Sequence, residues 1–197
     1  MSDATLDRRD VVRSLLERRG ELLVVAGLGS SAWDCTAAGD HPLTFPLWGA
    51  MGSACTIGLG LALAQPRRRV LVVTGDGEML MGLGSLATLA AQRPENLAVV
   101  VLDNERYGET GMQKTHTALG TDLAAVARAC GFAGAEIIRS SAQIAALRSG
   151  VYRGKGPLFY QVKVKRDAVP LVLPPRDGGL LKQRFREALL GEKAAID

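Results

Sequence analysis

The sequence has few cysteines and few aromatic residues. Three of its 197 residues are cysteine, and phenylalanine, tryptophan and tyrosine together make up 5%. Cys35, Cys55 and Cys130 have no paired short spacing, which excludes a disulfide scaffold and a zinc ribbon. Basic residues occur only in short clusters without interleaved aromatics, so we expect no nucleic-acid partner.

Long hydrophobic runs are also absent. The longest apolar stretch, Cys55–Ala64, is too short to cross a bilayer, and the charged segment Met1–Arg19 does not resemble a signal peptide. We therefore expect a cytoplasmic protein with reduced thiols and no membrane contact. The net charge of +4 predicts mild attraction for small anions.

What the sequence does contain is typical of a globular protein. Apolar residues make up 47% and charged residues 22%, and glycine is abundant at 23 residues. The length predicts a single domain spanning residues 1–197. The many glycines favour tight turns and close backbone packing.

Short apolar segments alternate with segments of helical periodicity. The expected strands are 22–26, 70–74, 97–102 and 157–165, and the expected helices are 7–19, 52–64, 79–92, 123–130, 141–147 and 179–190. Wholly apolar strands suit a sheet that is covered on both faces. The pattern predicts an α/β fold: a doubly wound, mostly parallel sheet with helices on both faces.

The segment Val70–Gly111 has the pattern of one strand–helix–strand unit. A strand ends near Thr74, a helical stretch follows, and a second strand ends near Leu102. Parallel strands joined by such a crossover commonly lie side by side, about 5 Å apart. Asp76 and Asn104 would then both emerge at the carboxyl edge of the sheet, where open α/β sheets bind ligands.

The residues around these two side chains favour a diphosphate and a divalent ion. Gly75 and Gly77 flank Asp76 and permit a tight turn with open backbone amides at a helix start, which suits a diphosphate. A carboxylate, an amide oxygen and a main-chain carbonyl are hard oxygen ligands that suit Mg²⁺. The pattern predicts an Mg²⁺–diphosphate site at this edge.

This pattern resembles the diphosphate-binding domain of thiamine-diphosphate enzymes, which include pyruvate decarboxylase, acetolactate synthase and benzoylformate decarboxylase. The resemblance rests on Gly75-Asp76-Gly77 followed by Asp103-Asn104. It implies that Mg²⁺ is bound by the side chains of Asp76 and Asn104 and by the main-chain carbonyl of Arg106. The other residues that it implies in cofactor binding are Gly29, Ser30, Ser31, Gly49, Met51, Gly75, Gly77, Glu78, Tyr107 and Gly108.

The resemblance also implies roles for some of these residues. The carbonyl of Gly49 would hold the aminopyrimidine ring, and the Met51 side chain would wedge the cofactor into a bent shape. Ser30 and Ser31 would face the phosphates.

Within this family, the chain most resembles the decarboxylases of 3-sulfopyruvate and 3-phosphonopyruvate. The similar segments include Met51-Gly52, Gly58–Ala62 and Thr110–Gln113. The resemblance implies decarboxylation of a small anionic 2-oxoacid, with 3-sulfopyruvate as the first expected substrate. Candidates for holding its anionic group are Arg106, Lys114 and His116.

The family also needs a glutamate that activates the cofactor, and this residue belongs to a separate pyrimidine-binding domain. The chain is too short to hold that domain, and Glu17 and Glu21 are poor candidates because they lie before the first strand. We therefore expect no catalytic residue here and an alpha-type partner subunit in a hetero-oligomer, α2β2 or larger.

Other functions stay open at this point. The chain could be a phosphonopyruvate decarboxylase subunit, a carboligase subunit similar to acetolactate synthase, or a non-catalytic cofactor-binding subunit. The run from Gly27 to Ala32 mimics a dinucleotide fingerprint, but no acidic residue follows about 20 residues later, which disfavours a nicotinamide site.

Overall fold

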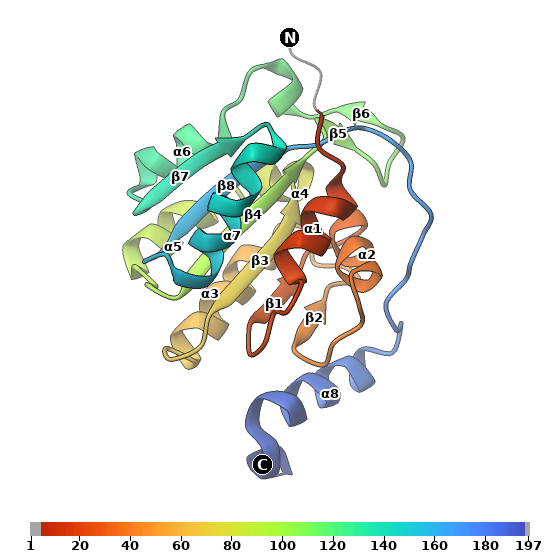
Figure 1. Cartoon of the computed structure of the whole chain (residues 1–197), viewed down its shortest axis with the longest axis vertical. Helices are drawn as coiled ribbons and strands as arrows, with labels where there is room; N and C mark the ends of the chain where they lie inside the picture. Colours follow the sequence, from red (N-terminus) through yellow and green to blue (C-terminus); the bar gives the residue numbers. More distant parts are fainter. Residues whose placement is uncertain (1–4, 196–197) are drawn as a thin grey trace.

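A computed structural model describes residues 5–195 of the chain. Its main feature is a six-stranded sheet in the order β2-β1-β3-β4-β8-β7, in which every neighbouring pair is parallel (Figure 1). The strands are β1 (Leu23–Ala26), β2 (Thr44–Pro46), β3 (Val70–Gly75), β4 (Leu97–Asp103), β7 (Gly134–Ile138) and β8 (Leu158–Lys163). The predicted α/β fold with a parallel sheet is confirmed.

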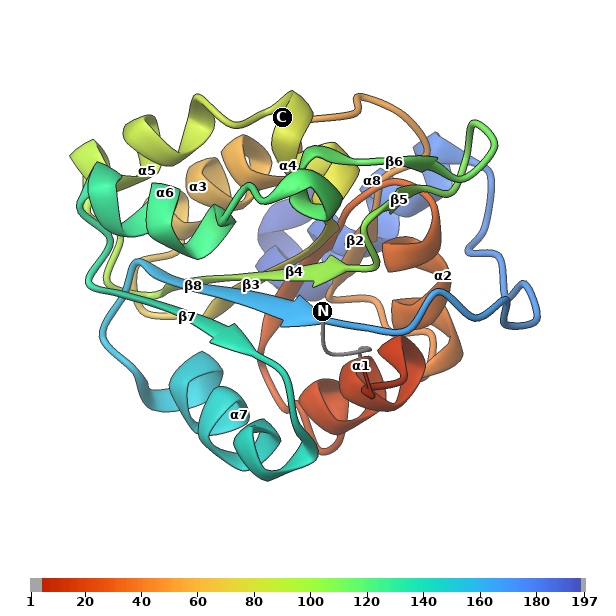
Figure 2. The same ribbon diagram turned by 90° about the horizontal axis from the view of Figure 1, so that it is seen from above.

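Helices cover both faces of this sheet, as Figure 2 shows from above. One face carries α1 (Arg8–Leu16), α2 (Ser30–Ala37) and α7 (Ile144–Arg153). The other carries α3 (Ala54–Ala64), α4 (Asp76–Met81), α5 (Ser85–Gln92) and α6 (Leu123–Cys130). Within residues 5–195 no helix is both long enough and apolar enough to cross a membrane.

The sheet has a hydrophobic layer on each face because successive side chains of a strand point to opposite sides. In β3, Val70 and Val72 join the layer under α3 and α5, whereas Leu71 and Val73 join the layer under α1 and α7. All four side chains are fully buried. This two-sided burial explains why the strand reads as an unbroken apolar run.

The expectation of one helix over 79–92 is wrong, because two helices, α4 and α5, occupy this stretch. The chain bends at Gly82, where the backbone passes close to Gly52: a Cβ on Gly82 would lie 2.2 Å from the Gly52 carbonyl oxygen. The first helix also begins earlier than expected, at Asp76. The segment 141–147 likewise differs, with a 3₁₀ turn (Ser141–Gln143) before α7.

Several elements were not anticipated from the sequence. They are α2, the short edge strand β2, the edge strand β7, the hairpin of β5 (Arg106–Tyr107) and β6 (Gln113–Lys114), and the 3₁₀ helix η1 (His116–Leu119). The hairpin strands pair antiparallel at the carboxyl edge of the sheet, directly after β4. This hairpin supplies much of the candidate site.

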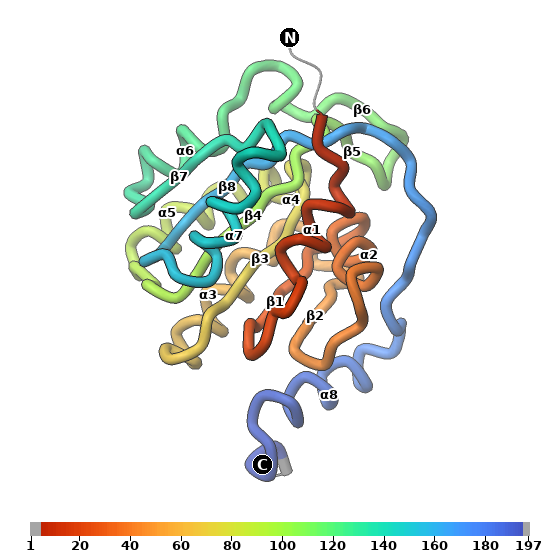
Figure 3. The backbone as a smooth tube through the Cα atoms, in the orientation of Figure 1, coloured from red at the N-terminus to blue at the C-terminus, as the bar shows by residue number. Residues whose placement is uncertain are grey.

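After β8 the chain runs along the outside of the molecule to the last long helix, α8 (Gly178–Leu190), a path that the tube in Figure 3 follows. The helix packs at the β2 edge, where the rings of Phe185 and Phe45 meet edge to face at 5.5 Å. Arg184 forms an ion pair with Asp40 at 2.6 Å. A 3₁₀ helix (Gly191–Ala195) follows.

The glycines of α3 provide a test of the close packing between this helix and β3. A Cβ on Gly58 would lie 2.2 Å from Cγ2 of Val72, whereas a Cβ on Gly60 would meet nothing within 4 Å. We expect Gly58→Ala to lower the free energy of unfolding by about 1–3 kcal/mol through overpacking. The matched variant Gly60→Ala should raise it by about 0.5–1 kcal/mol. Urea denaturation measures both, and equal effects would contradict this packing.

Candidate functional site

The candidate site lies where β3 and β4 end. These strands are parallel neighbours, and Gly75 of β3 pairs in register with Leu102 of β4. The residues that follow, Asp76 in one strand connection and Asp103 and Asn104 in the other, therefore emerge at the same edge of the sheet. The predicted neighbourhood of the two strands is confirmed.

Asp76 is a buried carboxylate that is held by hydroxyl groups. Its Oδ2 accepts hydrogen bonds from the hydroxyls of Thr115 at 2.6 Å and Thr117 at 3.2 Å. The residue is only 2% exposed. Within the part of the chain that the structure describes, no cationic side chain pairs with it. Burial and the nearby charge of Asp103 raise the pKa of the Asp76 carboxyl well above its usual range.

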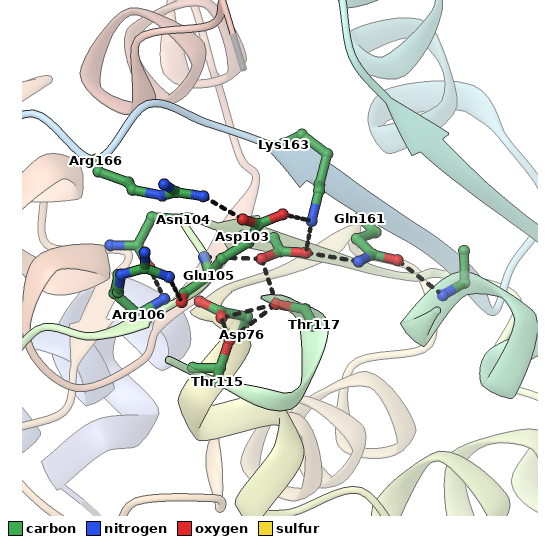
Figure 4. A network of polar contacts seen from close by, with 11 residues as sticks. Asp76, Asp103, Asn104, Glu105, Arg106, Thr115, Thr117, Gln161, Lys163 and Arg166 are labelled. Atoms are coloured by element: carbon green, nitrogen blue, oxygen red, sulfur yellow. Dashed lines mark hydrogen bonds and ion pairs between the residues drawn. The ribbon is translucent and has the colours of Figure 1, made fainter. Parts of the chain in front are cut away.

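The charge of Asp103, in contrast, is compensated by a cationic side chain. Its Oδ2 accepts hydrogen bonds from Gln161 at 2.6 Å and from the Lys163 ammonium at 2.8 Å. Its Oδ1 accepts one from Thr117 at 2.8 Å, so this hydroxyl lies between the two carboxylates (Figure 4). Asp103 therefore has a cationic partner, whereas none of the described cationic side chains pairs with Asp76.

Lys163 joins this network to the loop after β4. Its ammonium also pairs with Glu105 at 2.8 Å, and Arg166 contacts the other oxygen of Glu105. Burial alone would lower the pKa of Lys163, but the hydrogen bonds and charges of Asp103 and Glu105 outweigh it and raise that pKa. Lys163 is therefore held as a cation.

The loop 104–106 forms a tight turn. The Asn104 Oδ1 accepts a hydrogen bond from the backbone N–H of Arg106 at 3.0 Å, and the Arg106 guanidinium donates to the Glu105 carbonyl at 2.8 Å. In the hairpin, Arg106 pairs with Lys114. Two of the three predicted substrate residues are thus cross-strand neighbours, and the third, His116, begins η1 and is exposed.

The loop after β1 leads directly into α2. Gly29 has a φ of 72° and precedes Ser30 and Ser31, which open the helix without any side-chain cap. The Ser31 hydroxyl is buried, and its oxygen has no hydrogen-bond partner among the described residues. A buried hydroxyl without a partner beside free amides at a helix start is suited to an anion.

The segment 49–52 follows β2 and lies against α4. Ala50, between Gly49 and Met51, has a φ of 56°, an uncommon conformation for a residue with a side chain. Gly52 makes the close backbone contact with Gly82 described above. The two predicted cofactor residues therefore flank a strained position at the site, as is common at ligand-binding loops.

The buried side chain of Glu78 lies beneath the loops after β1, β2 and β3. Its carboxylate accepts a hydrogen bond from Thr74 at 2.8 Å and is 4% exposed. Burial raises its pKa, although Thr74 and the backbone N–H groups of Gly52, Ala54 and Leu28 favour the ionised form. Its Oε1 is buried without a hydrogen-bond partner among the described residues, and the cofactor role of Glu78 stays a prediction.

Tyr107 of the hairpin covers the Gly-Asp-Gly turn. A Cβ on Gly77 would lie 2.6 Å from the Tyr107 ring, so only glycine permits this approach. Gly108 follows at the hairpin tip. The predicted cofactor residues Gly75, Gly77, Tyr107 and Gly108 are thus brought together at one point of the edge.

A groove of about 1330 Å³ opens beside the network, lined by residues that include Asp103, Glu105, Lys163 and Arg166. None of the predicted cofactor residues lines it. A hollow of about 100 Å³ next to Gly29 and Trp48 lies nearer to them. Among residues 5–195 no group of three or more His, Cys, Asp or Glu side chains could hold a metal.

Residues 29–162 match the family described as "Thiamine pyrophosphate enzyme, C-terminal TPP binding domain". The chain belongs to this family. The predicted resemblance is therefore confirmed, and the matched segment includes every predicted cofactor residue.

Named relatives agree with this assignment. The chain is 37% identical over 186 residues to "Sulfopyruvate decarboxylase subunit beta" of Methanothermobacter thermautotrophicus, which covers 94% of this chain and 97% of that one. It is 37% identical over 188 residues to "Phosphonopyruvate decarboxylase" of Streptomyces hygroscopicus, which covers 94% of this chain but 46% of that one. The chain therefore spans about half the length of the second relative.

Among solved structures, the benzoylformate decarboxylase of Polynucleobacter necessarius superposes with a TM-score of 0.72. The sequence identity is 20%, and the match covers 86% of this chain and 36% of that one. This similarity supports the fold of the thiamine pyrophosphate enzymes.

Reasoning from the sequence missed Thr115, Thr117, Gln161 and Lys163. The first two follow the hairpin and the last two lie on β8. Because all four are far from Asp76 along the chain, these contacts left no local sign in the sequence. A polar pair in the otherwise apolar strand 158–163 was the one signal available, because a buried strand carries such residues only when they have partners.

Lys163 provides a test of the network. Replacing it with methionine keeps the stem but leaves the buried Asp103 carboxylate without a cation. We expect Lys163→Met to lower the free energy of unfolding by about 3 kcal/mol, as is usual when one partner of a buried pair is removed. The control Lys155→Met removes an exposed pair with Glu95 and should change far less. Equal effects in denaturant titrations would contradict the buried network.

Proposed function

We propose that the chain is the beta-type subunit of a thiamine-diphosphate- and Mg²⁺-dependent 2-oxoacid decarboxylase, with 3-sulfopyruvate as the first candidate substrate. The observation that carries the proposal is the pairing of β3 with β4, which brings Asp76 and Asn104 to one edge of the sheet. The match to a thiamine pyrophosphate family and to a relative named sulfopyruvate decarboxylase subunit beta supports it. We propose further that residues 1–197 are one diphosphate-binding domain.

The side chains of Asp76 and Asn104 and the carbonyl of Arg106 would hold the metal. The fit is favourable because Asp76 is a buried carboxylate with no cationic partner among the described residues, and a divalent ion would compensate its charge. The Asn104 Oδ1 accepts one hydrogen bond, and an amide oxygen has a second lone pair. Hard oxygen donors of this kind suit Mg²⁺ held in addition by phosphates and water.

The loops after β1 and β3 would hold the diphosphate. The Ser31 hydroxyl, which has no partner among the described residues, and the backbone N–H groups at the start of α2 would face the anion. Gly29, Ser30 and the turn of Gly75 and Gly77 would complete this surface, with Tyr107 and Gly108 beside it. Gly49 and Met51 would contact the aminopyrimidine, and Glu78 would hold the loops in place.

When bound, thiamine diphosphate would supply the carbanion that allows a 2-oxoacid to lose carbon dioxide. The residues of this chain would bind and orient the cofactor and hold the metal. Arg106, Lys114 and His116 would attract the anionic group of the substrate at the hairpin. A 3-phosphonopyruvate substrate is the second candidate, since the chain is equally similar to a phosphonopyruvate decarboxylase.

We propose an alpha-type partner subunit that carries the activating glutamate, in a hetero-oligomer of α2β2 or larger. The Methanothermobacter relative is named as a beta subunit. The phosphonopyruvate decarboxylase of Streptomyces hygroscopicus is about twice as long as the segment matched here, which covers 46% of it. Glu21 lies before β1, at the amino edge opposite the site, and contacts Arg68 there. This position supports a partner subunit as the source of the activating glutamate.

Asp76→Asn tests the metal assignment. The change keeps the shape of the side chain but removes the charge, so we expect Mg²⁺-dependent binding of thiamine diphosphate in the assembled complex to weaken at least about 100-fold. Thermal unfolding should show an intact fold, since no charged partner is left unpaired. Calorimetry with and without Mg²⁺ measures the binding, and Glu95→Gln at the opposite edge is the control. Undiminished binding by Asp76→Asn would end the assignment.

The partner proposal has its own test. The purified chain alone should not release carbon dioxide from 3-sulfopyruvate or 3-phosphonopyruvate in the presence of thiamine diphosphate and Mg²⁺. Activity should appear when a chain with the pyrimidine-binding domain is added, because that chain brings the glutamate. Full turnover by the single chain would refute the two-subunit arrangement.

A further inference from the structure

Glu105 has an unusual backbone conformation at an unusual place. Its φ of 63° lies in the left-handed region, which favours glycine and disfavours residues with long side chains. It stands between Asn104 and Arg106, the two proposed metal-binding residues of this loop. A backbone in this region persists only where surrounding contacts hold it.

Two ion pairs of the Glu105 side chain are among these contacts. One carboxylate oxygen of Glu105 pairs with Lys163 at 2.8 Å, and the other pairs with Arg166. The side chain is 16% exposed, so these pairs are largely shielded from water. Lys163 ends β8 and Arg166 lies just beyond it, which ties the loop to a neighbouring strand (Figure 4).

Hydrogen bonds of the backbone also support the left-handed turn at Glu105. The N–H of Glu105 donates to Asp103 at 3.1 Å, and the N–H of Arg106 donates to Asn104 at 3.0 Å. The Glu105 carbonyl accepts from the N–H of Thr115 at 3.2 Å. Thr115 also binds Asp76, so the turn and the proposed metal carboxylate share a support.

We propose that Glu105 is a positioning residue for the divalent ion. Its ion pairs with Lys163 and Arg166 hold residues 104–106 in the strained turn, and this turn sets the Asn104 side chain and the Arg106 main chain relative to Asp76. The inference rests on the proposed function, because it assigns Glu105 a role toward the metal of that site.

Two substitutions separate the effect of the Glu105 ion pairs from the effect of its backbone strain. Glu105→Ala removes the ion pairs but keeps a side chain that disfavours a positive φ, so the loop should relax. Glu105→Gly also removes the ion pairs, but glycine adopts the left-handed region at little cost, so the turn should survive without its anchor. A merely structural ion pair would give the two variants the same behaviour.

The readout is the affinity for Mn²⁺ in the presence of saturating thiamine diphosphate, followed by the electron paramagnetic resonance of free Mn²⁺. It uses the full chain, together with its partner subunit where one co-purifies. We expect Glu105→Ala to weaken Mn²⁺ binding about tenfold and Glu105→Gly to return it to within about threefold of the unmodified chain.

Arg93 provides the matched control. It also has a left-handed backbone, with a φ of 49°, but it ends α5 at the opposite edge of the sheet. Arg93→Ala and Arg93→Gly should leave Mn²⁺ affinity unchanged, whatever they do to stability. Thermal unfolding of all variants shows that each is folded.

The outcomes distinguish this inference from the proposed function. If the unmodified chain binds Mn²⁺ and the two Glu105 variants bind it equally, whether normally or weakly, the positioning role is wrong and the proposed function stands. If the unmodified chain binds no Mn²⁺ even when it is assembled with its partner subunit, both are wrong. Weak binding by the alanine variant with recovery in the glycine variant supports both.

Discussion

The parallel pairing of β3 with β4 is the constraint on which the site depends. Because Gly75 is in register with Leu102, the next residues of both strands reach the same edge at the same height. The strands themselves are buried on both faces by two hydrophobic layers, and a one-residue shift would move every side chain from one packed layer into the other. The core of the fold thereby brings Asp76 and Asn104 to the same edge of the sheet.

Charge compensation then distinguishes two neighbouring carboxylates. Asp103 and Asp76 are both buried and share the hydroxyl of Thr117, yet within residues 5–195 only Asp103 has a cationic partner, Lys163. Burial of a charge without compensation is costly, so one carboxylate is part of the scaffold and the other is suited to a cation. The same Lys163 holds Glu105 and connects the scaffold to the loop of the proposed metal ligands.

Much of the fold was predictable because strands buried on both faces leave a strong signal of short apolar runs. The elements that the sequence did not predict have two explanations. α2, β2 and β7 are short, and their pattern of apolar and polar residues is mixed. The break between α4 and α5 depends on a contact between Gly82 and Gly52, which are distant in sequence. In the site, Asp76 and Asn104 came from a motif. Thr115, Thr117 and Lys163 could not, because a hydrogen-bond partner on another strand has no local signature.

The sequence by itself determined the alternation of strands and helices, the family and the residues proposed for the cofactor, because periodicity and short motifs are local properties. Only the tertiary structure decided which of two neighbouring carboxylates pairs with a cation, that the Ser31 hydroxyl has no partner in the described part of the chain, and that Glu105 is held in a strained turn. These features depend on which side chains meet across the sheet edge, and that meeting follows from strand order and register.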